Sequence, residues 1–256
     1  MTTTRFLHRL LGAAALLAGF AAQAQTGPSY AVMSLVGDKI TLVIHQMSTG
    51  SHLDANRRIE TPMADDALDG VTAFAADDAI KRLQPSAKTS LFVTRDAKLF
   101  AMQDRSIDSN DGAVALAQAT KDLAAASNAT HLVLITKHRA ETRLRMSQGD
   151  YGSGRLTGIG FYVDKETPVT DETTGHSTTG FLAPYAYLKV SVFDMASLRL
   201  LRQETSIATE VASATDSRTA AVAWDAMTAE QKFDALKRVV RKAIDNAMPK
   251  VLDPGR

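Results

Sequence analysis

A short hydrophobic run lies near the middle of the chain, in the stretch Thr130–Lys137, which reads Thr-His-Leu-Val-Leu-Ile-Thr-Lys. Four consecutive apolar residues within a short β-prone segment are typical of a strand that is covered on both faces. We therefore expect this stretch to be the central strand of the fold, with both halves of the protein packed against it.

The first half of the chain begins with two strand-like runs, Tyr30–Val36 and Lys39–His45, on either side of Gly37-Asp38. Two strand-like runs separated by a two-residue, glycine-containing turn predict a β-hairpin. Thr61-Pro62 then predicts a helix start, since threonine caps helices and proline is tolerated at the first helical position. The pattern predicts a helix to about residue 83, with an apolar face made of Leu68, Val71, Ala75, Ala79 and Leu83, and Gly70 is the position where it would be divided in two.

A strand, a helix and the central strand follow in that order. Ser90–Thr94 is strand-like, and residues 97–103 suit a short helix or a continuation. Asn110 or Asp111 can cap a helix over residues 112–127. Its inward positions are expected to be Val114, Ala117 and Leu123. A strand-helix-strand order of this kind predicts a crossover with parallel pairing.

The second half is predicted to be mostly strand and loop. Residues 141–146 alternate in polarity, and Arg155–Asp164 resembles a returning strand. The region 165–180 is polar and has no period, so we expect a long surface loop. Residues 186–193 alternate as in a strand with one buried face, and residues 199–209 are expected to pair with it in a second hairpin.

A long C-terminal helix is the clearest helical prediction. Thr228 and Gln231 fit a capping box. The apolar positions behind it draw one helical stripe, and Pro249 is expected to end the helix at about Met248. The stripe consists of Phe233, Leu236, Val240, Ala243, Ala247 and Val251. Together the elements predict an α/β (α+β) fold, with a mixed β-sheet, N-terminal and C-terminal hairpins, flanking helices and a long C-terminal helix.

The N-terminus has the pattern of a secretory signal peptide. Arg5 and Arg9 precede a short apolar run, and Ala22-Gln23-Ala24 forms a small-x-small cleavage site. The apolar run is short for a membrane span. We expect residues 1–24 to be removed after Ala24, which leaves residues 25–256 as a single mature α/β domain in the periplasm or outside the cell. The sequence contains no cysteine, so neither a disulfide nor a lipid-bearing cysteine is possible.

The charge balance argues against a nucleic-acid partner. Without the two leader arginines, the 29 basic residues become 27, against 28 acidic ones. A general nucleic-acid binder shows a strongly basic domain or stripe, which is missing here. No later segment of the sequence has the length of a transmembrane helix.

No stretch of the sequence carries a recognisable catalytic or metal-binding motif. The histidines at positions 45, 52, 131, 138 and 176 lack the spacing of a zinc site. Ser153 lies between two glycines, but the segment departs from the Gly-x-Ser-x-Gly pattern and from phosphate-binding loops. The sequence therefore assigns no catalytic residue, no metal ligand and no cofactor.

A candidate binding surface lies between residues 138 and 184. Arginines stand on both sides of a glycine-rich turn and gather on one face if the two segments form a hairpin, where they would suit an anion or a protein partner. The alternative is that they protect a sheet edge from aggregation. The candidate residues are His138, Arg143, Arg145, Tyr151, Arg155 and Tyr162.

The order of elements, the segments Ala129–Ile135 and Val192–Ser197, and the long C-terminal helix resemble the envelope α/β domains of the curli-secretion channel subunit and of the lipoprotein activators of penicillin-binding proteins. The resemblance implies a mixed sheet flanked by helices that acts by binding other envelope components. It transfers no functional residue, and the missing lipid-bearing cysteine departs from both families.

Three functions remain open from the sequence. The favoured one is an exported envelope accessory or binding protein without catalytic activity, with envelope proteins or glycans as partners. A small-molecule or glycan binder would use the loop at 165–180 with the aromatic residues Tyr151, Tyr162, Tyr185 and Tyr187. A hydrolase would need a histidine and a carboxylate that converge in a cleft.

Overall fold

The computed structural model describes residues 27–46, 54–109, 111–146, 149–170, 177–211, 224–225 and 227–252. The predicted leader and its cleavage site after Ala24 lie outside these ranges. The described strands are β1 (Ser29–Ser34), β2 (Lys39–Ile44), β3 (Arg57–Pro62), β4 (Lys88–Phe92), β5 (His131–Lys137), β6 (Arg139–Glu141), β7 (Leu144–Met146), β8 (Gly149–Tyr151), β9 (Arg155–Thr170), β10 (Ser177–Asp194) and β11 (Leu200–Thr209). The described helices are α2 (Ala67–Leu83), α3 (Ala97–Ser106), α4 (Gly112–Ala125) and α6 (Ala229–Leu252).

The described strands form a mixed nine-stranded sheet and a separate β7-β8 pair. The main order is β3-β2-β9-β10-β5-β1-β4, with β11 paired to β10 and β6 paired to β9. The predicted mixed α/β fold is therefore confirmed. None of the described helices combines the length and the hydrophobicity that a membrane span requires.

Strand β5 is the central strand that the hydrophobic run predicts. It pairs in parallel with β1 and antiparallel with β10, and Leu132–Lys137 is buried throughout. The predicted parallel crossover is also present, although its two strands do not touch. Strands β4 and β5 lie on either side of β1 and are both parallel to it.

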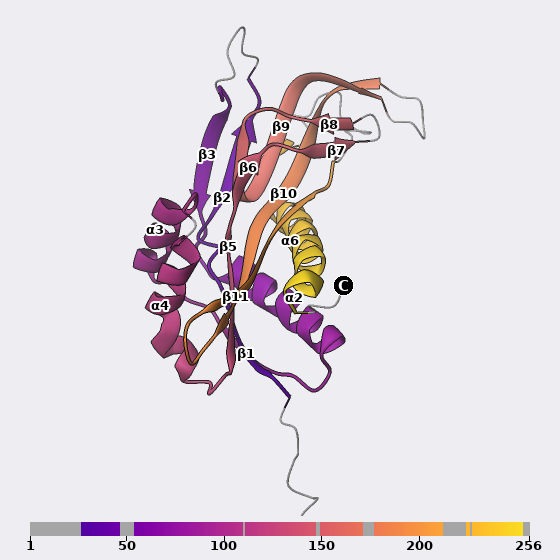
Figure 1. The fold of residues 1–256 in the computed structure, drawn as a ribbon. Coiled ribbons are helices and arrows are strands. Elements are labelled where there is room, and N and C mark those ends of the chain that lie inside the picture. The colour runs from indigo at the N-terminus through magenta and orange to yellow at the C-terminus, as the bar shows by residue number, and fades with distance from the viewer. Residues whose placement is uncertain are drawn as a thin grey trace, which may run out of the picture.

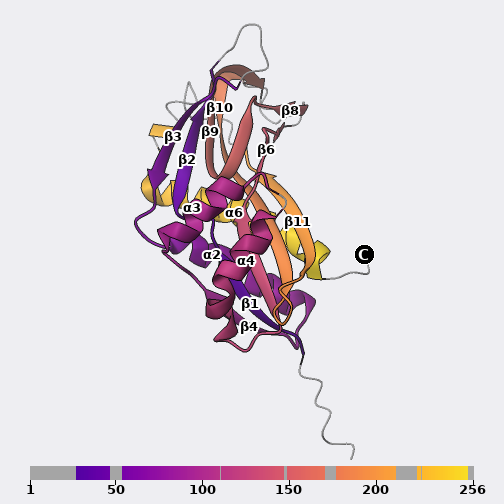
Figure 2. The same cartoon turned by 60° about the vertical axis from the view of Figure 1, so that its left-hand side comes forward.

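Helices cover both faces of this part of the sheet (Figures 1 and 2). Helices α2 and α6 pack on one face, where Val133 and Ile135 of β5 join Leu236 and Val240 of α6 in one apolar cluster. Helices α3 and α4 pack on the other face. Burial on both faces explains why β5 has an unbroken apolar run instead of alternation.

The predicted N-terminal hairpin is wrong. Strand β1 does not pair with β2, because β9, β10 and β5 lie between them in the sheet. Strand β2 pairs instead with β3 in antiparallel register and with β9 in parallel. Gly37 does not adopt a positive φ, so the residues between β1 and β2 form no hairpin turn of the type that the sequence suggests.

The carboxylate of Asp69 holds the chain where it leaves β1. The backbone N–H groups of Val36 and Gly37 donate to Asp69 Oδ1 at 2.7 and 3.1 Å, and the Ser34 hydroxyl donates to the same oxygen. Burial raises the pKa of Asp69 to about 6, against these hydrogen bonds, which lower it. The carboxylate thus replaces a hairpin turn, at the cost of placing an ionisable group in the interior.

This raised pKa predicts a specific pH dependence. The folded pKa of Asp69 lies above the unfolded value, so the group favours the folded state more as the pH falls through about 6 toward 4. When the pH is lowered from 7 to 5, protonation of Asp69 should raise the free energy of unfolding by about 1 kcal/mol. Urea unfolding of the parent and of Asp69→Asn at both pH values tests this. Parallel pH profiles for the two proteins would contradict it.

Two helices differ from their predictions in detail. Thr61-Pro62 ends the edge strand β3, where a missing N–H costs no pairing, and helix α2 begins at Ala67 and continues through Gly70. In α4, the predicted inward position Ala117 is buried, but Val114 and Leu123 are 40 % and 47 % exposed, so these two predictions are wrong. Small residues let the helix lie close to the sheet, and the buried positions are Gly112, Ala113, Leu116, Ala117, Thr120 and Ala124.

The predicted loop at residues 165–180 is mostly strand. Strand β9 continues to Thr170, and β10 starts at Ser177 and pairs with it. Residues 171–176 lie outside the described ranges. The second predicted hairpin, β10 with β11, is confirmed. However, β10 is buried on both faces rather than one, since Tyr187 and Leu188 both have 0 % exposure.

Helix α6 confirms the capping box and most of the predicted stripe. The Thr228 N–H donates to Gln231 Oε1 at 2.8 Å, and the Gln231 N–H donates to Thr228 Oγ1 at 3.2 Å. The helix continues through Pro249 to Leu252, where the prediction ends it at about Met248. Leu252 is 7 % exposed, so tertiary burial stabilises the last turn beyond the proline.

Candidate functional site

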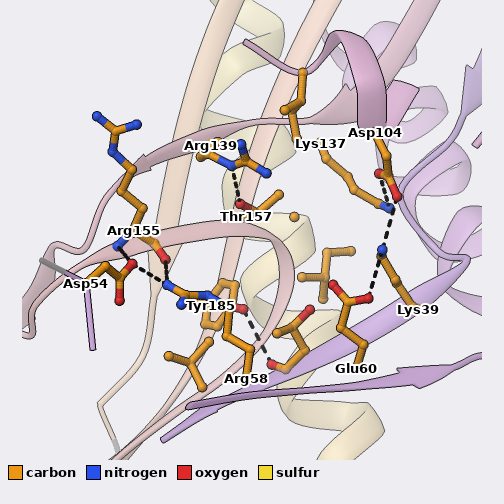
Figure 3. Close-up of a pocket in the computed structure, with 15 residues that line it drawn as sticks. Lys39, Asp54, Arg58, Glu60, Asp104, Lys137, Arg139, Arg155, Thr157 and Tyr185 are labelled. Carbon is orange, nitrogen blue, oxygen red and sulfur yellow. Dashed lines mark hydrogen bonds and ion pairs between the residues drawn. The ribbon is translucent and has the colours of Figure 1, made fainter. Parts of the chain in front are cut away.

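A cleft of about 460 Å³ opens beside the end of β5 that leads into β6 (Figure 3). Its walls come mainly from β2, β3, β5, β6, β9, β10 and helix α3, which are spread over much of the sequence. Most of the side chains that face it are charged. The lining residues are Lys39, Thr41, Val43, Asp54, Arg58, Glu60, Asp104, Ile107, Lys137, Arg139, Arg155, Thr157, Gly158, Ile159 and Tyr185.

The deepest charge of the cleft belongs to Lys137, the last residue of β5. Its side chain is 3 % exposed, and its Nζ lies 2.7 Å from Asp38 Oδ1 and 3.0 Å from Asp104 Oδ1. Gly158 makes room for it. This glycine has a φ of +63°, and a Cβ atom there would lie 3.0 Å from Lys137 Cγ. A larger residue would be strained and would press on the lysine stem.

Lys39 extends the same network to the edge of the sheet. Its Nζ lies 3.0 Å from Asp104 Oδ2 and 3.0 Å from Glu60 Oε2. Burial would raise the pKa of Asp104, but the nearby charge and hydrogen bond of Lys137, with those of Lys39, hold it below its ordinary value. Burial would lower the pKa of Lys39, but its hydrogen bonds and ion pairs with Asp104 and Glu60 hold this pKa above its ordinary value. Both groups therefore keep their charges at neutral pH.

A second group of contacts joins the chain before β3 to the start of β9. The Arg58 guanidinium pairs with Asp54 and donates to the backbone oxygen of Arg155 at 2.9 Å. The Arg155 N–H donates to Asp54 Oδ2 at 2.9 Å. Burial would raise the pKa of Asp54, but these hydrogen bonds and the charge of Arg58 hold it below its ordinary value. Arg58 lies across one wall of the cleft as a fixed side chain (Figure 3).

Two further arginines stand at the mouth of the cleft. Arg139 of β6 donates from Nε to Thr157 Oγ1 at 3.2 Å, and its Nη1 lies 2.8 Å from Asp108 Oδ2. Arg155 is exposed, and its guanidinium makes no hydrogen bond or ion pair with any described residue. The cleft thus combines a locked interior with arginine side chains at its opening.

The structure separates the six residues of the candidate surface. Only Arg155 lines the cleft. His138 stands between the cleft residues Lys137 and Arg139 in the sequence and is half-buried. Burial, with the charge of Lys189, lowers the pKa of His138. Arg143 and Arg145 are exposed but belong to the segment around β7, not to the cleft. Whether these four residues bind anything stays a prediction.

The tyrosines proposed for glycan stacking are mostly inside the protein. Tyr162, Tyr185 and Tyr187 each have 0 % exposure, so they offer no exposed ring face to a sugar. Tyr151 is partly exposed and packs against Phe181 edge to face, with ring centroids 6.5 Å apart. The alternating pattern of β10 did not reveal this, because the β6–β8 segment covers the face that a simple strand would expose.

Sequence reasoning missed most of the cleft. The sequence pattern identifies Lys137 only as the last residue of the central strand. A lysine that ends a buried, mostly apolar run indicates a paired, buried charge. Arg58 lies between the predicted strand Lys39–His45 and the predicted helix start at Thr61-Pro62, where the sequence indicates no site. No local pattern links them, since the cleft depends on which strands become neighbours.

Ser153, which the sequence singled out weakly, does contact a histidine. Ser153 Oγ, Tyr162 Oη and Asn56 Oδ1 lie 3.1, 3.0 and 3.3 Å from His45 Nδ1. A catalytic serine needs a base nitrogen of its own and an acid that orients the base. Here three groups share one nitrogen, and no carboxylate in the described ranges bonds His45. The cluster is a junction that ties the end of β2 to the turn between β8 and β9.

The histidines of the described ranges belong to no group that is suited to hold a metal ion. His52 and His176 lie outside the described residues. Within the described part of the chain, no three His, Cys, Asp or Glu side chains form a group suited to hold a metal ion.

Comparisons with known proteins find structural likeness without a family. No family model matches the chain, and no curated protein does. A PelC dodecamer from Paraburkholderia phytofirmans aligns at 12% identity over 90% of this chain and 89% of its own, with a TM-score of 0.31. A Xanthomonas campestris protein aligns at 9% identity over 86% and 82%, with a TM-score of 0.34. A putative neuraminyllactose-binding hemagglutinin homolog from Helicobacter pylori aligns at 6% identity over 86% and 80%, with a TM-score of 0.33.

Proposed function

We propose that this chain is an exported binding protein of the cell envelope without catalytic activity, and that the charged cleft holds a polar small molecule or a glycan. The observation that carries the proposal is the cleft itself. Its volume of about 460 Å³ is in the range of ligand sites, and its walls combine charged groups with the hydroxyl-bearing residues Thr41 and Thr157.

The protonation states of the cleft favour binding over proton transfer. General acid–base catalysis works best when a group has a pKa near the operating pH. The pKa values of Asp54 and Asp104 are lowered and that of Lys39 is raised, so all three pKa values lie farther from neutral pH than the ordinary values do. Groups of this kind hold a fixed charge and suit the positioning of a polar ligand.

Pre-organisation is a second support. Lys39, Lys137 and Arg58 are each held by at least two partners, so little side-chain freedom remains to be lost when a ligand enters. An exported protein with such a cleft meets peptidoglycan fragments and surface polysaccharides, which are polar and offer many hydroxyl groups.

Blocking the cleft tests the proposal. Thr157→Tyr places an aromatic ring in the cleft, and Thr205→Tyr makes the same change on an exposed position of β11, away from it. The probes are peptidoglycan disaccharide fragments, uronic-acid oligosaccharides and neutral oligosaccharides, each titrated by NMR. We expect at least one class to shift the backbone amides of Thr41 and Thr157. Its affinity should fall at least about tenfold in Thr157→Tyr and stay at the parental level in Thr205→Tyr.

Two results would count against the proposal. One is that no probe shifts the amides of the cleft. The other is that a probe binds the parent and Thr157→Tyr with equal affinity, which would place its site elsewhere.

A further inference from the structure

The arginines at the mouth of the cleft lie on one face of a single strand pair. In the antiparallel β6-β9 register, Arg139 is opposite Thr157 and Glu141 is opposite Arg155. Positions two residues apart on a strand share a face, so Arg139 and Arg155 are diagonal neighbours. Long side chains at diagonal positions can reach a common ligand, although Arg155 extends away from Arg139 in Figure 3.

These two arginines have hydrogen-bonding capacity that the interior does not use. Arg155 donates none of its side-chain N–H groups to a described residue. Arg139 pairs with Asp108, but the two side chains are 39% and 60% exposed, and exposed pairs contribute about 0–1 kcal/mol. A ligand anion can therefore replace Asp108 at little cost.

The charge balance of the lining points the same way. Among the described residues that line the cleft, five are basic and three are acidic. The acidic ones, Asp54, Glu60 and Asp104, are already paired with Arg58, Lys39 and Lys137. Arg139 pairs with Asp108, which lies outside the lining, so the remaining positive charge at the mouth is that of Arg155. Guanidinium groups bind carboxylate and phosphate groups through paired N–H donors.

We propose that the cleft binds a sugar that carries an oxyanion, a carboxylate or a phosphate, and that Arg155 and Arg139 hold this group. The inference rests on the proposed function and adds the ligand class. In the bound state the oxyanion lies at the mouth between the two guanidinium groups. The sugar ring extends inward, where Thr41, Thr157 and the carboxylate of Glu60 accept or donate hydrogen bonds to its hydroxyls.

A matched pair of ligands isolates the oxyanion. Oligogalacturonate and its methyl ester share the sugar rings and differ in charge. Titration calorimetry of the parent should give at least about tenfold tighter binding of the acid. Inorganic phosphate and a sugar phosphate form the second arm. Tighter binding of the sugar phosphate than of oligogalacturonate assigns phosphate as the oxyanion, and the reverse assigns carboxylate.

Substitution of the arginine supplies the second readout. Arg155→Gln should reduce the binding of the acid by about tenfold and remove the preference for acid over ester. Arg202→Gln is the control, because Arg202 is exposed on β11 and lies outside the cleft. It should leave both affinities unchanged.

The failures of the two proposals are distinguishable. Equal binding of acid and ester at the cleft, or no effect of Arg155→Gln, overturns the oxyanion assignment and leaves the cleft as a binding site. The absence of binding by every acidic probe also overturns the assignment. If neutral probes likewise leave the amides of the cleft unshifted, the proposed function falls with it.

Discussion

Replacing Lys137 by methionine is expected to lower the free energy of unfolding by about 3 kcal/mol, which is the scale for breaking a buried ion pair from one side. Lys137 is 3 % exposed and contacts both Asp38 and Asp104. Methionine fills a similar volume but leaves the two carboxylates with one cation fewer. The loss therefore comes mainly from uncompensated negative charge rather than from a cavity. Urea unfolding at pH 7 measures it.

Lys39→Met is the matched control for this experiment. Lys39 belongs to the same network, but its side chain is 26 % exposed and its partners are 54 % and 35 % exposed. Solvent screens these pairs, so the expected loss is below about 1 kcal/mol. Equal losses for the two variants would show that burial does not govern the strength of the network. A loss under about 0.5 kcal/mol for Lys137→Met would show that water reaches the lysine.

Leu236→Ala is expected to lower the free energy of unfolding by about 2–5 kcal/mol, as for other buried leucines. Leu236 lies on α6 and is 2 % exposed. It belongs to the same apolar cluster as Leu68 of α2 and Val133 of β5. Removing its side chain leaves a cavity between two helices and the sheet, which a packed core fills only in part. Chemical unfolding monitored by circular dichroism gives the difference.

Leu123→Ala controls for the helical context of that substitution. Leu123 also lies on a helix but is 47 % exposed, so its loss should be below about 0.5 kcal/mol. The sequence pattern predicted both leucines to face inward, and the comparison measures the difference directly. If Leu236→Ala cost no more than Leu123→Ala, the α6 stripe would contribute little to the core.

The central strand shows what local sequence determines. An unbroken apolar run predicts burial on both faces, because each exposed apolar side chain would lose the hydrophobic stabilisation of the fold. Residues 132–137 are buried as this rule predicts. The capping box at Thr228 was also predicted from local sequence. The antiparallel β10-β11 pair was also predicted correctly, since a short connection leaves the second strand few other partners. These features depend on residues close together in sequence.

The pairing of β1 and the cleft show what local sequence leaves open. Gly37-Asp38 has the composition of a hairpin turn, yet β1 is placed between β4 and β5, where both of its edges are paired and both faces are covered. That placement removes more apolar surface from water than a hairpin at the sheet edge would.

The choice of strand partners also decided which residues form the candidate site. Once β2 pairs with β9 and β3 instead of β1, Lys39 and Arg58 come beside Lys137 and Arg155, which are about a hundred residues away in sequence. The sequence by itself determined the central strand with its two-sided burial, the β10-β11 hairpin and the C-terminal helix. The order of strands decided which charges meet, because long-range burial depends on the whole chain and no spacing within one segment encodes it.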